Sequence, residues 1–231
     1  HSFPTRRSSD LVHAMREGYV KDRVACTNRM RGVMAEFGLI LPKTTGVFRN
    51  QVSALLDSKA DEMPELTRQV LERCFEYFQT LEKQIKWCDQ QIARHVATDG
   101  AAKLAYTLPG IGVMGASALV ATVGDPSVFR NGRQFSAWLG LVPRQSSTGG
   151  RQKLGRITRR GDSYLRKLLV LGARAALRVA ARKEDDVSKW AMQLLERAGP
   201  GKTAVALANK NARTAWRLLA NRQKASADPS G

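Results

Sequence analysis

A run of small hydroxyl and glycine residues at positions 146–150, Ser-Ser-Thr-Gly-Gly, stands directly before a group of basic residues. A hydroxyl that attacks phosphorus must lose its proton, and the transition state spreads negative charge over the non-bridging oxygens. Such chemistry needs cations close by, which Arg151, Lys153 and Arg156 would supply. Without further information the same run is typical of an ordinary flexible loop, so the residues alone leave both interpretations open.

Basic residues are concentrated in positions 140–183, which hold twelve Lys and Arg residues and a single acid, Asp162. This segment carries +11 of the chain's formal net charge of +18. A surface this basic needs a polyanion to lie against, and phosphate backbones are the commonest one in a cell. DNA is therefore the expected partner, and the residues expected to contact it here are Arg144, Arg151, Lys153, Arg156, Arg159, Arg160, Arg166 and Lys167.

A second phosphate-binding feature is expected at residues 109–112, Pro-Gly-Ile-Gly, between two short helical segments. The glycines allow a tight turn at the start of a helix, so that free backbone amides and the positive end of the helix dipole face outwards. The pattern matches a helix-hairpin-helix motif near residues 104–123, with Gly110 and Gly112 as contacts to a DNA backbone. Glycine turns also open many helices for purely structural reasons, and that alternative stays open.

The elements that position these residues are predicted to be mainly helical, which gives an all-α fold class. Helical spacing over residues 12–37 ends in a stretch containing Pro42. After Pro64, apolar residues recur three and four apart as a heptad seam: Leu71, Cys74, Phe78, Leu81, Ile85, Cys88 and Ile92. This coiled-coil arm needs a partner helix, either residues 12–37 of the same chain, antiparallel, or a second protomer in a homo-oligomer. Phe75, Tyr77 and Trp87 lie off the seam and could dock the arm elsewhere.

The predicted organisation is a helical coiled-coil region at residues 12–99 and a compact helical domain at residues 100–222. That domain contains the helix-hairpin-helix motif and the basic Gly/Ser-rich loop. Asp162 is the expected N-cap of a helix over residues 163–183, and a last helix covers residues 203–222. Residues 223–231 are predicted to be a disordered tail by composition.

Composition excludes several classes of protein. No run of eighteen uncharged apolar residues exists, which argues against a membrane span. The three cysteines, Cys26, Cys74 and Cys88, lack metal-ligand spacing and are expected to be reduced core thiols of a cytoplasmic protein. No metal site and no cofactor are expected in this chain.

The first eleven residues, HSFPTRRSSDL, resemble the translation of an adapter used in short-read sequencing libraries. We therefore expect residues 1–11 to be disordered and foreign to the fold. On this interpretation the chain is a fragment that lacks its natural N-terminal part.

Three segments in order, LPGIGVMGASALVATVGD, then FRNGRQFSAWLGLVPRQSSTGGRQKLGRITRRGDSYLRKLLVLGARAAL, and VALANKNARTAWRLL, resemble the C-terminal transposase domain of the insertion-sequence-110 family, in particular its 1111 branch. The similarity extends back to about Val12. The resemblance implies a bacterial, nucleoid-associated recombinase in two catalytic parts, guided by a structured bridge RNA and active as an oligomer. An N-terminal RuvC-like domain would supply acidic residues for Mg²⁺, and the C-terminal domain a serine that attacks DNA.

In that family the matching loop commonly reads His/Asn-Ser-Ser/Thr-Gly-Gly, which places the nucleophile on Ser147. Thr148 is the alternative because it directly precedes the glycines, and Ser146 is the third candidate. Without the acidic domain we expect the fragment to bind DNA but not to complete transposition. The alternative function, from the residues alone, is a non-catalytic helix-hairpin-helix protein that binds DNA structures.

Overall fold

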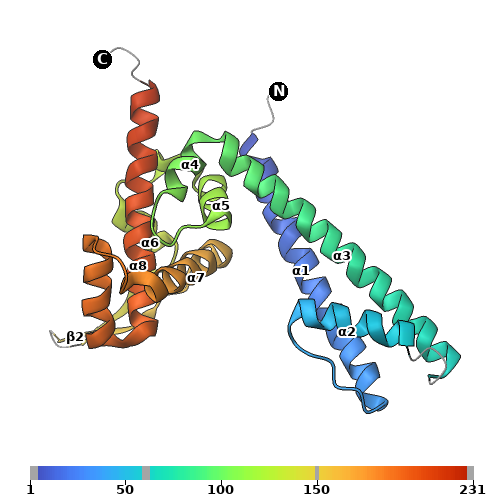
Figure 1. Ribbon diagram of the computed structural model, residues 1–231. Coiled ribbons are helices and arrows are strands. Elements are labelled where there is room, and N and C mark those ends of the chain that lie inside the picture. Colours follow the sequence, from blue (N-terminus) through green and yellow to red (C-terminus); the bar gives the residue numbers. More distant parts are fainter. Residues whose placement is uncertain (1–4, 59–62, 149–150, 228–231) are drawn as a thin grey trace. The chain divides into compact units, whose positions relative to one another are not determined.

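The computed structural model describes residues 5–58, 63–148 and 151–227 (Figure 1). It divides into two compact units. The first, here named the helical arm, is Leu11–Gln91. The second, named the basic unit, is Ile92–Gly231 together with His1–Asp10. The predicted boundary at residues 99 and 100 therefore lies eight residues later than the division of the chain, because Val96, near the end of a long helix, packs in the core of the basic unit.

The helical arm consists of α1 (Thr5–Glu36), α2 (Thr45–Ser58) and α3 (Glu65–Thr98). Two ion pairs join α1 to α3, Arg16 to Asp89 at 2.5 Å and Arg23 to Glu82 at 2.5 Å. The two pairs are seven residues apart on each helix and run in opposite directions, so the helices are antiparallel (Figure 1). Within this chain, α1 is thus the partner of the seam on α3, and oligomerisation through the arm stays a prediction.

The apolar face of α3 is wider than the predicted seam because α2 packs against it as well. Phe48 of α2 lies 5.4 Å from Phe78 of α3 between ring centroids, and both side chains are completely buried. Phe75, expected to lie off the seam, is also buried and stacks on Phe78. Tyr77 and Trp87 are half exposed, as residues outside the seam should be.

The cysteines of the arm are free thiols, with Cys26 and Cys88 buried and Cys74 half-buried. The Sγ of Cys26 donates to the backbone oxygen of Cys74 at 3.3 Å. Burial, followed by the neighbouring Cys74, raises the pKa of Cys26, so this thiol is unreactive at neutral pH. Cys26 and Cys88 thus lie in the core as expected, and the reduced state of the three thiols stays a prediction.

The basic unit contains α4 (Gly100–Tyr106), α5 (Val113–Val123), the 3₁₀ turn η1 (Pro126–Val128), α6 (Gly132–Trp138), a hairpin of β1 (Pro143–Thr148) and β2 (Arg151–Ile157), α7 (Ser163–Ala180) and α8 (Asp186–Ala227). Its core brings together Leu119 of α5, Phe135 of α6, Leu165 of α7 and Leu207 of α8. The small residues Gly115, Ala116, Ala118 and Ala121 of α5 are buried, which lets neighbouring helices approach closely.

The last helix is longer than predicted at both ends. Gly199 has non-helical angles (φ 77°, ψ 168°), and Pro200 restarts the helix, so α8 consists of two helices over residues 186–198 and 200–227. The expected disordered tail is wrong for residues 223–227, where Ala225 and Ala227 favour continuation of the helix. The expected disorder of residues 1–11 is likewise wrong from Thr5 onwards, because α1 begins there.

Candidate nucleic-acid interface

The segment expected to be a basic Gly/Ser-rich loop is an antiparallel hairpin. Ser146 pairs with Lys153, Ser147 with Gln152 and Thr148 with Arg151 in the ladder. The pairing continues at the base, where the Thr158 N–H donates to the Val142 oxygen at 2.9 Å. The prediction of a loop was wrong. It rested on the preference of serine for turns, which is weak compared with the backbone hydrogen bonds of a paired strand.

The structure thus describes the backbone of Ser146, Ser147 and Thr148. The side chains of these three residues lie outside the described part of the structure, as do those of Arg151 and Lys153. Gly149 and Gly150 lie outside it entirely. The assignment of the nucleophile to Ser147, Thr148 or Ser146 stays a prediction. What the backbone establishes is that all three candidates occupy one strand, paired with a strand that carries basic residues.

The base of the hairpin is held rigidly against the helices on either side of it. Gly161 has φ +83°, and a Cβ on it would overlap the carbonyl oxygen of Trp138, so only glycine lets the two backbones cross here. Arg166 of α7 donates from Nη1 to the oxygens of Leu139, at 3.0 Å, and Arg160, at 3.1 Å. This guanidinium, expected to contact DNA, is instead bonded to the backbone on both sides of the hairpin.

The single acid of the basic segment is a helix cap. Asp162 accepts a hydrogen bond from the Leu165 N–H at 2.8 Å, and α7 begins at the next residue, as predicted. The carboxylate is therefore bonded to backbone and offers no ligand set for a metal. In the described residues, no group of three or more His, Cys, Asp or Glu side chains could hold a metal ion.

The glycine turn at residues 109–112 joins α4 to α5 and is held against two other helices. A Cβ on Gly110 (φ +84°) would lie 2.8 Å from the Gly172 oxygen of α7, and the Asn211 amide of α8 donates to the Pro109 oxygen at 2.7 Å. The structural role left open in the sequence analysis thus applies to Gly110. Gly112 is exposed, with open space around its Cα, at the start of α5. Its contact with phosphate stays a prediction.

A cavity of about 930 Å³, here named the hairpin pocket, lies at the base of the hairpin against α8. Four cationic residues line it, and no acidic residue does: Arg156, Arg159, Lys202 and Arg213. None of these four forms an ion pair with another residue in the described ranges. Trp190 and Ile157 add apolar surface. The pocket thus combines a cationic rim with an aromatic wall, which suits an anionic ligand that also carries flat rings.

Three further predicted DNA contacts are not among the residues that line this pocket. Arg144, Arg160 and Lys167 are exposed, and Arg144 donates only a long bond of 3.4 Å to the Thr158 oxygen. Sequence reasoning missed Lys202 and Arg213. Their signal was present in the spacing, because residues 202, 206, 209 and 213 recur at helical intervals and all line the pocket from one face of α8.

Residues 102–188, from α4 to the start of α8, match the model of the IS116/IS110/IS902 transposase family. The chain is also 45% identical over 212 residues to a Pseudomonas aeruginosa protein named probable family 20 transposase, covering 90% of this chain and 62% of that relative. The chain is thus similar to transposases of the IS110 family, over residues 102–188 by the family model and over nine tenths of its length by this relative.

Two further relatives in this family are transposases for named insertion elements. The chain is 35% identical over 219 residues to that of IS1328 from Yersinia enterocolitica, covering 93% of this chain and 65% of the relative. It is 34% identical over 209 residues to that of IS1111A from Coxiella burnetii, covering 90% and 57%. The resemblance to the 1111 branch is thus confirmed. The chain spans less than two thirds of the length of these IS110-family relatives. No helix in the described ranges is long and apolar enough to cross a bilayer.

Proposed function

We propose that this chain takes part in DNA transposition by binding DNA and presenting a serine nucleophile for strand cleavage and exchange. The observation that carries the proposal is the hairpin pocket, whose charged lining residues are all cationic, at the base of the strand that holds Ser147. Similarity to IS110-family transposases supports the reaction class. The basic unit supplies the charge, because it carries 26 Lys and Arg residues against nine acids, or +17 of the net +18.

In the proposed step the Ser147 hydroxyl loses its proton and its oxygen bonds to phosphorus. The phosphorus–oxygen bond to one deoxyribose breaks, and that sugar oxygen leaves with a proton. The linkage conserves the phosphodiester energy, so a second DNA hydroxyl can reverse the step on a new strand. Arg156 and Arg159 would offset the charge that develops on the non-bridging oxygens.

Among the described residues, no group of three or more acidic, histidine or cysteine side chains is placed to hold a metal ion, and Asp162 is bonded to the backbone of α7. These residues do not fit a Mg²⁺ ion. We propose instead that Mg²⁺ is held by a separate acidic domain, and that a bridge-type guide RNA and further copies of the chain join the active complex. The nucleoid is where such a complex would act.

The test puts this chain in place of the matching part of the full-length Pseudomonas relative and looks for a covalent protein–DNA adduct that survives denaturation. We expect the adduct with the unmutated chain, its loss with Ser147→Ala, and its retention with Ser146→Ala as the matched control. An adduct that persists in Ser147→Ala but disappears in Thr148→Ala would move the nucleophile by one residue. Absence of any adduct would favour the non-catalytic DNA-structure-binding function.

A further inference from the structure

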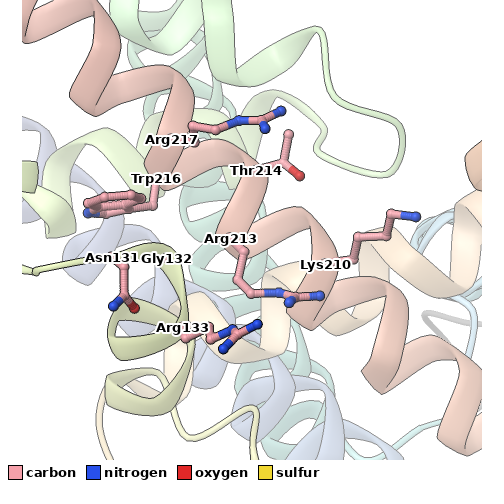
Figure 2. Close-up of a pocket in the computed structure, with 8 residues that line it drawn as sticks. All are labelled: Asn131, Gly132, Arg133, Lys210, Arg213, Thr214, Trp216 and Arg217. Atoms are coloured by element: carbon pink, nitrogen blue, oxygen red, sulfur yellow. The ribbon is translucent and has the colours of Figure 1, made fainter.

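A second cavity, of about 570 Å³, lies between the N-terminal end of α6 and the second half of α8. We name it the α6–α8 groove. Figure 2 shows Lys210, Arg213, Thr214 and Arg217 extending from α8 to the same side, with Arg133 of α6 reaching toward Arg213. Among the residues that the structure describes, no acid lines the groove.

The cationic residues of the groove follow the spacing of one helix face. Residues 213, 214 and 217 follow Lys210 by three, four and seven positions. At 1.5 Å per residue they extend along about 10 Å of α8 on one face. Arg133, Arg213 and Arg217 are exposed, and none forms an ion pair with a described residue. A row of unpaired guanidinium groups with an intervening hydroxyl suits successive phosphates of one strand.

Two contacts connect the groove to the hairpin pocket. Arg213 lines both cavities. Lys210 of the groove lies with its Nζ 4.5 Å from the ring centroid of Trp190, which lines the hairpin pocket. The cationic surface is therefore continuous across α8 between the two cavities.

We propose that the α6–α8 groove binds the sugar-phosphate backbone of duplex DNA, as a continuation of the path that starts at the hairpin pocket. This inference rests on the proposed function for the identity of the polymer. Duplex is favoured over single strands because the one aromatic residue of the groove faces inwards: Trp216 donates from Nε1 to the Pro126 oxygen at 2.9 Å. Without an outward ring the groove lacks the stacking surface that single-stranded bases require.

The experiment compares two double variants that each remove two positive charges. Arg133→Gln with Arg217→Gln alters the groove alone, because neither residue lines the hairpin pocket. Lys189→Gln with Arg197→Gln removes two exposed charges from the first half of α8, away from both cavities. Binding of the full chain to a 30-bp duplex is measured by fluorescence anisotropy from roughly 50 to 200 mM salt, the range over which phosphate contacts dominate the dependence.

We expect the slope of log K against log salt to become shallower by about 1.8 in the groove variant, at about 0.9 per lost phosphate contact, and to stay unchanged in the control. Arg133→Lys with Arg217→Lys should restore most of the slope, and thermal melting checks that each variant is folded. An unchanged slope in the folded groove variant would overturn the inference while leaving the proposed function intact. A slope change seen with single strands or RNA but not with duplex DNA would also overturn it. Failure of the unmutated chain to bind any DNA would overturn the proposed function and this inference together.

Discussion

The helical arm and the basic unit use their acidic side chains in different ways. The arm holds twelve basic and eleven acidic residues, and its acids form ion pairs with arginines, as in Arg16–Asp89, Arg23–Glu82 and Arg68–Glu72. The basic unit holds few acids, and several of them accept hydrogen bonds from backbone N–H groups at the start of helices. These are Asp99 before α4, Asp125 before η1, Asp162 before α7 and Asp185 before α8.

The difference explains how a chain of this charge can be both folded and ready to bind. A carboxylate that pairs with an arginine neutralises it, whereas a carboxylate that caps a helix satisfies backbone donors and leaves the arginines unpaired. Stability of the arm thus comes from packing and pairing. In the basic unit it comes from packing and capping, so that Arg156, Arg159 and Arg213 can face a polyanion.

The largest expected effect tests whether stability and binding are separate properties of the two units. Phe78→Ala removes a completely buried ring between α2 and α3, and should destabilise the arm by about 3–5 kcal/mol. The salt slope of DNA binding should stay unchanged, because nearly all the net charge lies in the basic unit. Urea unfolding followed by circular dichroism gives the first quantity and anisotropy the second. A binding slope that falls along with stability would show that the units do not act separately.

The next effect concerns the hairpin pocket. Arg156→Gln with Arg159→Gln should weaken duplex binding by about 3 kcal/mol or more, at about 1.5–3 kcal/mol for each charge-assisted hydrogen bond, and change folding stability by less than about 0.5 kcal/mol. Both residues are exposed, and neither forms an ion pair within the part of the chain that the structure describes. The matched control, Arg23→Gln with Arg49→Gln, removes the same charge from the arm and breaks both ion pairs of Glu82. It should lower stability but not affinity, and the reverse outcome for either variant would contradict the comparison.

The sequence predicted the features that depend on local pattern. The seam on α3 and the cap by Asp162 were both predicted, because apolar periodicity and capping are decided by near neighbours along the chain. The hairpin was not predicted. Pairing of residues 143–148 with residues 151–157 depends on more distant neighbours, and the preference of serine and glycine for turns opposes it.

The candidate site was predicted only in part for a similar reason. Arg156 and Arg159 stood out in a basic run, whereas Lys202 and Arg213 are scattered in an apolar helix and join them only through the fold. Arg166, in the same basic run, donates hydrogen bonds to backbone oxygens, a role that charge density alone did not indicate, and its contact with DNA stays a prediction. Charge density along a sequence gives the partner class, but the contacts depend on which guanidinium groups the fold leaves unpaired.

A smaller effect separates capping from pairing directly. Glu82→Gln removes the charge that two arginines share and should cost about 1 kcal/mol, a loss that shrinks at high salt. Asp162→Asn removes the same charge from a cap, and should cost only a few tenths of a kcal/mol because asparagine caps helices as well as aspartate. Denaturant midpoints at low and high salt check both. Equal costs for the two substitutions would mean that Asp162 acts through its charge rather than as an acceptor.

The smallest effect is a pH dependence at the cap of α8. Ser188 donates to Asp185 from its hydroxyl, at 2.7 Å, and from its backbone N–H, at 3.0 Å. These hydrogen bonds, the hydroxyl first, lower the pKa of Asp185 below its ordinary value of 3.8. A lowered pKa in the folded state stabilises the fold fully above the ordinary value, and this stabilisation is lost as the pH falls through the lowered pKa.

Ser188→Ala should therefore raise the pKa of Asp185 toward its ordinary value, measured by NMR titration of the Asp185 carboxyl carbon. Acid unfolding of the basic unit should then begin at a slightly higher pH. The control is Ser163→Ala, which alters an exposed serine directly after another capping acid, Asp162, and should leave the Asp185 titration unchanged. If Ser188→Ala did not move the titration, the lowered pKa would come from the surrounding lysines and arginines. The acids of the basic unit would then resemble those of the arm, and the contrast between the two units would not hold.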